Sequence, residues 1–206
     1  MKPKSIIIIL AVIVVVISVF YSFQSGDDNK AYIKQIEKER EDKDHFMKTA
    51  SESPFGDKKS EMKGLNYFPV NADYKIIATL TPIEKKDVVV LTTSDGKDQH
   101  YLTYAYAEFD LANRSNKLLI LEVMESGPFR GTLFLAFGDE TSARETYGAG
   151  RYLDVKKVPG SSTITLDFNL AYNPYCAYSD GFSCPLPPKE NLLSIAINAG
   201  EKTYSH

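Results

Sequence analysis

The stretch TTSDGKDQHYLTYAYAEFDLANRSNKLLILEV, residues 92–123, decides the fold class of this chain. Its Asp95-Gly96 pair suits a tight turn that needs a positive φ. A second turn is indicated by LANRSNKL, residues 111–118. Apolar residues on either side of these turns recur with the period of two that is typical of a strand. We therefore predict strands over residues 87–93, 99–109 and 117–123, joined as antiparallel hairpins.

Further apolar runs extend this pattern along the chain and predict strands over 74–81, 132–138, 162–168 and 191–198. In TLFLAFGD, residues 132–139, both faces are apolar, which predicts a central strand. No long helical period remains to connect parallel strands. The predicted fold class is mainly β: an antiparallel β-sandwich or barrel-like domain over residues 64–206, preceded by a transmembrane helix and a charged α-helix.

The composition limits the classes of partner. The formal net charge is −3 and the pI is about 5.7, so the chain lacks the basic face that binding to nucleic-acid phosphates requires. Thirteen tyrosines and eleven phenylalanines favour half-buried sheet, where aromatic rings pack well. A stacking platform for sugars would use the same residues, and the sequence leaves that alternative open.

The first 26 residues form a separate module. No charge occurs from Ser5 to Phe23, and 19 helical residues span roughly 28 Å, close to the hydrocarbon thickness of a bilayer. Two lysines precede this run and two aspartates follow it, which places the N-terminus in the cytoplasm. We expect residues 5–23 to contact the lipid bilayer as an uncleaved single-pass anchor, with the main domain extracytoplasmic. A cleaved signal peptide is the rival interpretation.

Residues 27–63 are rich in charges of both signs. DDNKAYIKQIEKEREDKDHFMKTA, residues 27–50, predicts a helix, and Pro54 and Gly56 then indicate a loop. The apolar stripe from Ile33 to Met47 is thin and becomes polar in its middle, at Arg40. We therefore expect the helix to dock weakly, through its ends, and to present a solvated charged face. Such a segment could act as a stalk between the membrane and the domain.

Several standard chemistries are missing from the sequence. It contains no glycine-rich phosphate loop, no G-x-S-x-G, no H-E-x-x-H and no C-x-x-C. Its three histidines, His45, His100 and His206, do not stand in loops suited to a catalytic triad. We therefore expect no metal and no cofactor. Catalysis by carboxylates, tyrosine or arginine is left open.

Polar residues gather in two loops, 139–151 and 169–188. If Asp167 faces inward it must be paired, and Arg151 is the partner we expect, because a guanidinium can donate two parallel hydrogen bonds to a carboxylate. A buried pair of this kind can equally serve only to fasten a loop to a sheet. The candidate ligand-binding residues are Glu145, Tyr147, Arg151, Asp167, Asn169 and Asn173.

Two cysteines, Cys176 and Cys184, flank the loop CAYSDGFSC. In an exported domain the oxidising environment favours a disulfide between them. Closing this loop of nine residues would stabilise the fold by about 2.5 kcal/mol in the chain-entropy model. Free thiols are the alternative, and the separation of the two Cα atoms decides between them.

Several motifs, in this order along the chain, are similar to an uncharacterised bacterial family, domain-of-unknown-function family sixteen-eighty-four. The motifs are ETYGAGRYLD, DFNLAYNPYCAY, CPLPPKEN and AGEK. The resemblance covers roughly residues 37–202, and the family carries no established activity to transfer. Ala143 stands where the family pattern has a glycine. The resemblance implies that these polar and special positions belong to the family pattern: Thr141, Glu145, Tyr147, Gly150, Arg151, Asp167, Asn169, Tyr172, Asn173, Pro174, Cys176, Cys184, Pro185 and Asn191.

Three functions compete at this point. The first is a membrane-anchored binding module that holds a small polar or anionic ligand between loops 139–151 and 169–188, with Arg151 suggesting the anion. The second is a structural or interaction protein of the cell envelope, whose protein partner the sequence does not identify. The third is a hydrolase that uses Asp139, Glu145 and Asp167, two of which would have to face one open cleft.

Overall fold

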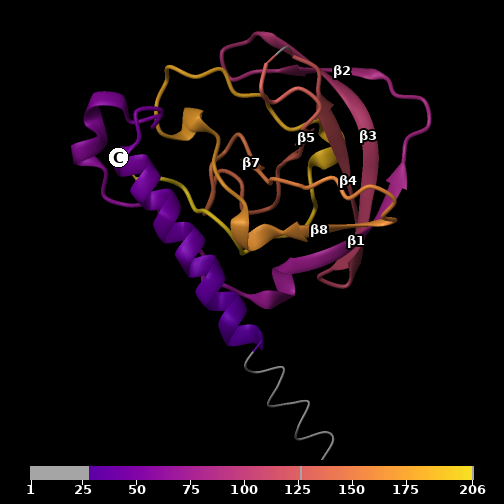
Figure 1. Ribbon diagram of the computed structural model, residues 1–206, viewed down its shortest axis with the longest axis horizontal. Helices are drawn as coiled ribbons and strands as arrows, with labels where there is room; N and C mark the ends of the chain where they lie inside the picture. Colours follow the sequence, from indigo (N-terminus) through magenta and orange to yellow (C-terminus); the bar gives the residue numbers. More distant parts are fainter. Residues whose placement is uncertain (1–27, 126, 206) are drawn as a thin grey trace, which may run out of the picture.

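The computed structural model describes residues 28–125 and 127–205. Its main element is a six-stranded antiparallel sheet with the strand order β5-β4-β3-β1-β8, in which β2 also pairs with β3 (Figure 1). The strands are β1 (Lys75–Pro82), β2 (Val88–Thr92), β3 (Asp98–Leu111), β4 (Arg114–Val123), β5 (Leu133–Phe134) and β8 (Thr163–Asp167). A second sheet has two strands, β6 (Ala136–Phe137) and β7 (Arg151–Tyr152).

The two predicted hairpins are confirmed. In the first, Gly96 adopts a φ of 79° and the Thr93 amide donates to the Lys97 carbonyl at 2.8 Å. In the second, Ala112 and Asn113 have φ values of 55° and 57° between β3 and β4. Asparagine tolerates this left-handed conformation better than most residues, which fits its place in the turn. The mainly antiparallel β class is therefore correct.

Two of the predicted strands differ in the structure. Residues 132–138 divide into β5 and β6, which belong to different sheets, so this run is not one central strand. Residues 191–198 form no strand, although Leu193, Ile195 and Ile197 are buried with the alternation of one. Their backbone bonds to residues 138–140 along the first half, where the Leu193 amide meets the Gly138 carbonyl at 2.8 Å. Beyond Ile195, carbonyls of this segment accept from an arginine side chain instead of a neighbouring strand.

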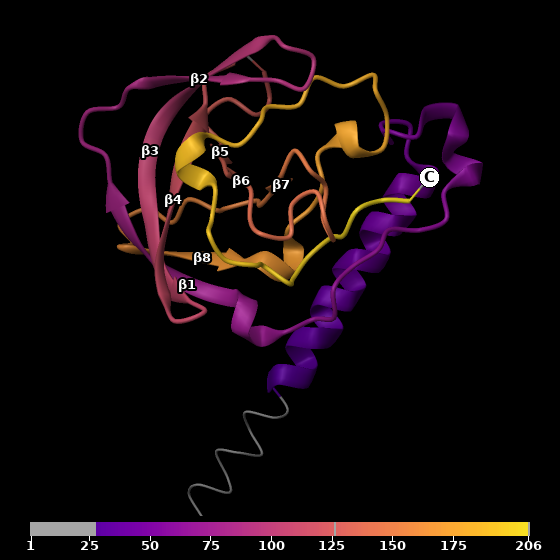
Figure 2. The same ribbon diagram turned by 180° about the vertical axis from the view of Figure 1, so that it is seen from behind.

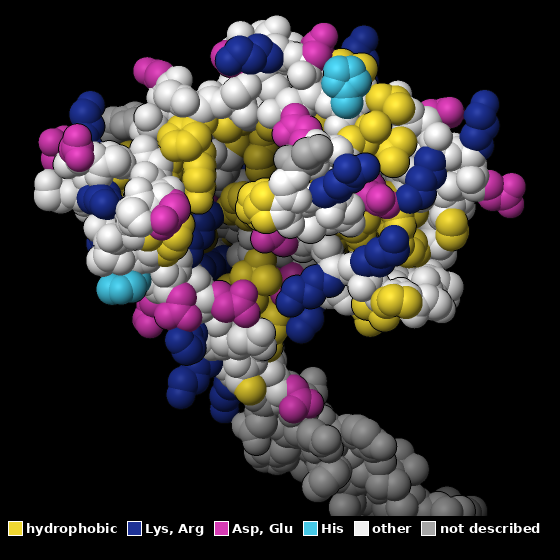
Figure 3. All heavy atoms as spheres, turned by 45° about the horizontal axis from the view of Figure 1, so that its top comes forward, with side chains coloured by type: hydrophobic (Ala, Val, Ile, Leu, Met, Phe, Trp, Pro, Cys, Tyr) yellow, Lys and Arg dark blue, Asp and Glu magenta, His cyan; other side chains and the backbone are white. Residues whose placement is uncertain are grey.

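The core lies between the large sheet and the irregular second half of the chain. The sheet contributes residues such as Ala107, Leu118 and Ile120, and the irregular chain contributes Phe137 and Leu153. The second half therefore takes the place that a second full sheet would occupy in a sandwich. On the face seen in Figure 3, hydrophobic side chains gather inside a hollow, and acidic and basic side chains are interspersed around it.

Short 3₁₀ helices lie in the irregular parts of the chain. They are η1 (Gly56–Glu61), η2 (Ala72–Tyr74), η3 (Phe168–Leu170), η4 (Tyr175–Ala177) and η5 (Lys189–Asn191). Asn191, at the end of η5, is fully buried. Its side chain makes the pair of hydrogen bonds that the backbone of a neighbouring strand would make. Its side chain accepts from the Leu119 amide at 2.6 Å and donates to the Leu119 carbonyl at 2.9 Å. An amide side chain thus completes the hydrogen bonding of β4.

The predicted helix is present over residues 28–49 and runs along one side of the domain (Figures 1 and 2). The expectation that it docks weakly through its ends is wrong. Ile36 and Met47 are each only 1% exposed, and the polar middle of the stripe also contacts the domain. Arg40 donates to the Phe68 carbonyl at 2.9 Å and to the Asn169 carbonyl at 3.1 Å. The helix is therefore an integral part of the folded domain.

The expected anchor, residues 1–26 with its apolar run 5–23, lies outside the described residues. Within residues 28–125 and 127–205, no helix combines the length and the apolar composition that crossing a membrane requires.

Candidate functional site

Arg151 lies at the start of β7 with its side chain 1% exposed. Its Nη2 donates to Asp139 Oδ2 at 2.8 Å and to the Ile197 carbonyl at 3.0 Å. Its Nη1 donates to the Ala199 carbonyl and, at 3.3 Å, to the Glu201 carbonyl. The predicted pairing with Asp167 is therefore wrong, because Asp139 supplies the carboxylate. Burial lowers the pKa of Arg151, and the nearby Asp139 opposes that shift.

Asp139 is held as completely as Arg151. Its Oδ1 accepts from the Thr141 amide at 2.8 Å and from the Thr141 hydroxyl at 2.6 Å. The Ile197 amide donates to the same oxygen at 3.3 Å. Asp139 and Arg151 together bind the 139–141 turn, β7 and the extended segment 197–201. Their joint role is structural, because both Nη atoms of Arg151 are bonded within the fold. The Nε of Arg151 is buried as well, and it has no hydrogen-bond partner among the described residues.

Asp167 and Asn169 connect the helix to the domain. The Tyr32 hydroxyl lies 2.7 and 2.8 Å from the two Asp167 carboxylate oxygens. Asn169, fully buried, donates to that hydroxyl at 3.0 Å and to the Asn71 carbonyl at 2.8 Å, and accepts from the Asn71 amide at 2.9 Å. Burial and then the hydrogen bond to Asp167 raise the pKa of Tyr32.

Asn173 belongs to a buried cluster around Glu201. Its Nδ2 donates to Glu201 Oε1 at 3.0 Å and to the Lys202 carbonyl at 2.8 Å. Glu201, fully buried, also accepts from Lys43 at 2.8 Å and from the Tyr178 hydroxyl. Burial and then the charge of Glu201 raise the pKa of Tyr178. Sequence reasoning did not single out Glu201, although the AGEK motif contained it.

Glu145 and Tyr147 lie apart from these buried groups. Glu145 is exposed, and its carbonyl accepts from the Thr203 amide at 3.0 Å. It lines a shallow cavity of about 450 Å³ together with Tyr67, Arg144 and Lys202. Tyr147 is half-buried and lines neither this cavity nor the larger cleft below. The structure thus does not bring the six candidate residues together into one site.

The Cys176 and Cys184 sulfurs are joined at 2.12 Å, with the two Cα atoms 6.3 Å apart. The loop that they close is also fixed to the β2–β3 turn, where the Ser94 amide donates to the Cys184 carbonyl at 2.8 Å. The Ser183 hydroxyl donates to Asp95 Oδ1 at 2.6 Å. This loop is consequently a firm wall for whatever lies beside it.

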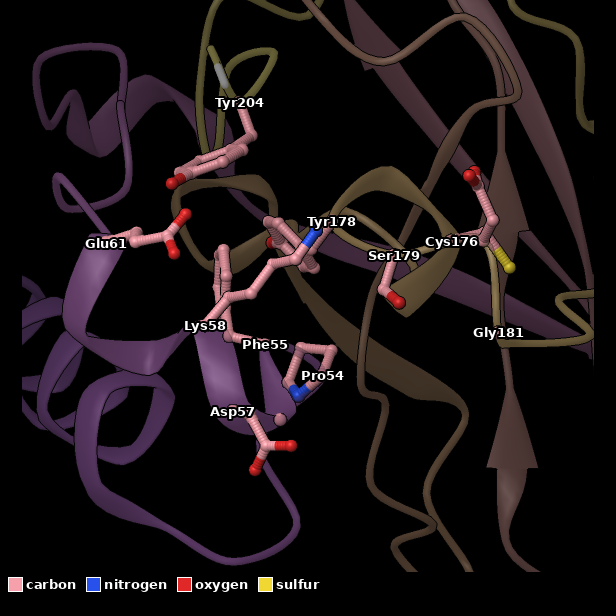
Figure 4. A pocket seen from close by; sticks show the side chains of 12 residues that line it. Pro54, Phe55, Asp57, Lys58, Glu61, Cys176, Tyr178, Ser179, Gly181 and Tyr204 are labelled. Carbon is pink, nitrogen blue, oxygen red and sulfur yellow. The ribbon is translucent and has the colours of Figure 1, made fainter.

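A cleft of about 740 Å³ opens beside this loop (Figure 4). Residues 54–61, with η1, form one wall and residues 176–181 form the other. Three aromatic rings, Phe55, Tyr178 and Tyr204, form its floor and contact one another at centroid distances of 5.2 to 5.7 Å. Sequence reasoning found the disulfide loop but missed the opposite wall, because 54–61 read only as a linker. Charged and polar groups complete the lining: Asp57, Lys58, Glu61, Ser179 and Asp180.

Within the part of the chain that the structure describes, no two of the acids that the hydrolase hypothesis named line the same cavity. Among the described residues, no group of three or more His, Cys, Asp or Glu side chains is placed to hold a metal ion. The proposed hydrolase needed two of Asp139, Glu145 and Asp167 in one open cleft. Asp139 is buried against Arg151, Asp167 is bound by Tyr32, and neither lines the two cavities described above.

The chain matches a known protein family. A family model described as "Protein of unknown function (DUF1684)" matches residues 60–202. The chain belongs to this family. Its suspected membership is thereby confirmed, and the family match contains the Arg151–Asp139 pair, Glu201 and the disulfide loop. A search among curated proteins finds no match.

One solved structure shows the fold of a relative. It is the solution NMR structure of an uncharacterised protein from Haloarcula marismortui, which is 38% identical to this chain. The similarity covers 86% of this chain and 97% of that chain, with a TM-score of 0.65. The two chains therefore share a fold, and that relative is described only as uncharacterised.

Proposed function

We propose that this DUF1684 protein is a membrane-tethered binding module that holds a small polar ligand in the cleft beside the disulfide loop. One observation carries the proposal: an open cleft of about 740 Å³ with an aromatic floor, polar walls and one wall fixed by a covalent cross-link. Concave sites that combine apolar surface with a few polar groups are typical of small-molecule binding. A wall held rigid before binding also reduces the entropy lost when a ligand enters.

The buried polar residues direct the proposal to this cleft. Arg151, Asn169 and Asn173 are each at most 1% exposed and already bonded within the protein. Opening any of them to a ligand would leave a buried group without its partner, which costs about 1–3 kcal/mol or more. The residues lining the cleft carry no such penalty, because its charged side chains face solvent.

The tether is the second part of the proposal. The apolar run 5–23, with lysines before it and aspartates after it, supports a single-pass anchor with an extracytoplasmic domain. The disulfide suits the oxidising environment outside the cytoplasm. The helix 28–49 follows the anchor directly and is packed on the domain, so it would set the orientation of the domain at the membrane.

A structural role in the envelope is the second candidate. It is favoured by the number of polar positions in the family motifs that act only within the fold, such as Arg151 and Asn191. In that case the cleft would bind no small molecule, and a stoichiometric protein partner would copurify with the full-length chain. The carboxylate-based hydrolase expected from Asp139, Glu145 and Asp167 loses its basis, because Asp139 and Asp167 are bonded within the fold.

The cleft can be tested by filling it. The full-length chain in lipid nanodiscs would be screened against small polar molecules by ligand-detected NMR. A Cβ at Gly181 would meet nothing closer than the Ser179 hydroxyl at 3.8 Å, so Gly181→Trp should fold and fill the cleft. We expect it to abolish the binding of any hit. Ser115→Trp, at an exposed position of β4, is the matched control and should bind normally. Hits that survive Gly181→Trp would place binding elsewhere and overturn the proposal.

A further inference from the structure

We infer that the ligand of this cleft is a small organic cation, bound through an ammonium or guanidinium group over the aromatic floor. The inference rests on the proposed function and names the chemical class of its ligand. It replaces the anion expected from the sequence, since Arg151, which suggested an anion, is buried against Asp139.

The aromatic rings at the floor of the cleft favour a positively charged ligand. Phe55 and Tyr178 lie 5.5 Å apart at a tilt of 40°, and Tyr204 packs edge-on against both rings. Phe55 is half-buried, while the two tyrosines are at most 8% exposed. Aromatic faces attract cations through the ring quadrupole, most strongly where water is partly excluded.

The rim adds a net negative field. Asp57, Glu61 and Asp180 line the cleft against one cation, Lys58, so three negative charges oppose one positive charge. All four side chains are exposed. In Figure 4 the hydroxyl end of Tyr204 and the carboxylate of Glu61 point toward one another, so acidic and aromatic groups meet at the same wall. A concave site lined mainly by one sign of charge raises the local concentration of the opposite ion.

Elsewhere in this protein, lysine side chains lie over tyrosine rings at contact distance. Lys117 Nζ lies 3.9 Å from the centroid of Tyr106, and Lys43 Nζ lies 4.6 Å from that of Tyr172. In those two pairs the cation comes from the chain itself. Among the described residues, no lysine or arginine lies over the Phe55 ring in this way, so a cation from outside can take the corresponding position there.

A shape-matched series of probes separates charge from size. Binding of choline, its neutral isostere 3,3-dimethylbutan-1-ol and the anion 3,3-dimethylbutanoate would be measured by ligand-detected NMR on the full-length chain in zwitterionic nanodiscs. We expect choline to bind about five- to tenfold more tightly than the alcohol, and the anion most weakly. Gly181→Trp should abolish choline binding. Equal or tighter binding of the alcohol or the anion would overturn the cationic ligand while leaving the proposed binding module intact.

Charge-changing variants make the test two-sided. Lys58→Met should strengthen choline binding about two- to fivefold, because it removes a repelling charge, whereas Asp180→Asn should weaken it by a similar factor. Binding of the uncharged alcohol should change less than that of choline in both variants, because it does not respond to the charge of the rim. Glu84→Gln and Lys85→Met, both exposed in the turn between β1 and β2, are matched controls and should have no effect.

The remaining outcomes are also decisive. If Lys58→Met weakens choline binding, the rim does not act through its charge and the inference fails. If neither choline nor any molecule of the wider polar panel binds, the inference and the proposed function fail together. If only neutral or anionic panel members bind, and Gly181→Trp blocks them, the cleft is a site for a different ligand class.

Discussion

Arg151 and Asp139 form an ion pair in the interior of the protein, with Nη2 2.8 Å from Oδ2 and each side chain 1% exposed. The same guanidinium donates to carbonyls of the extended segment 197–201, where a neighbouring strand would otherwise lie. One side chain thus replaces part of a sheet. This relationship explains why the last apolar run alternates like a strand without becoming one.

Replacing Arg151 should be severely destabilising. Arg151→Ala removes the donor to Asp139 Oδ2 and to three buried backbone carbonyls, which should lower the free energy of unfolding by about 3–5 kcal/mol. Chemical denaturation followed by far-ultraviolet circular dichroism would measure the loss. Arg144→Ala, at an exposed position in the same loop, should change the stability by less than about 0.5 kcal/mol. A similar stability for both variants would show that the pair is not structural.

The Tyr32 hydroxyl should be a measurable part of helix docking. Tyr32→Phe removes its contacts with Asp167 and Asn169 and should cost about 1–2 kcal/mol, because a hydrogen bond to a charged group is lost while its partners stay partly buried. Hydrogen exchange should then quicken in the helix 28–49 more than in β3 and β4. Uniform changes in exchange across the chain would contradict local docking through this residue.

Alkaline pH should unfold the protein through its tyrosines. Burial raises the pKa of seven of them, in the case of Tyr101 to about 12: Tyr32, Tyr67, Tyr101, Tyr152, Tyr172, Tyr175 and Tyr178. A phenol with a higher pKa in the folded chain holds its proton more tightly there. Its stabilising contribution is therefore complete below pH 10 and is lost as the pH rises through the folded value.

Absorbance at 295 nm would follow this ionisation directly. At pH 11 the native chain should titrate only part of its 13 tyrosines, and the rest should ionise together with unfolding. In guanidinium chloride all of them should titrate near pH 10. Ionisation of every tyrosine near pH 10 without loss of circular dichroism would show that their burial is not maintained.

Replacing Ala143 with glycine should stabilise the protein. It has a φ of 62°, a conformation that costs an L-residue roughly 1–2 kcal/mol. Ala143→Gly relieves this strain but gains entropy in the unfolded chain, so we expect a net stabilisation of about 0.5–1 kcal/mol. Ala149→Gly, whose φ is not in the left-handed region, should destabilise the protein instead. Thermal denaturation of the two variants side by side should show melting temperatures shifted in opposite directions.

The anchor prediction can be checked by fractionation. The full-length chain should remain in the membrane pellet after carbonate extraction, whereas a chain that lacks residues 1–26 should not. Protease added outside intact spheroplasts should digest the β domain if it faces outward. Protection of the domain in intact spheroplasts, with digestion only after lysis, would reverse the proposed topology.

Local patterning predicted a large part of this fold. Period-two alternation and the Asp95-Gly96 and Ala112-Asn113 turns predicted four adjoining strands close to their observed bounds, because these signals depend on near neighbours. The charged composition of residues 27–50 likewise predicted the helix. The motifs were enough to identify the DUF1684 family.

Partnership between distant residues was decided only by the tertiary structure. Arg151 pairs with Asp139 rather than Asp167, and Lys43 of the helix meets Glu201 158 positions away. Sequence spacing carries no information about which buried charge will satisfy which other, because each choice depends on how the whole chain packs. For the same reason the cleft arose from a linker, 54–61, and a disulfide loop that only the fold brings together.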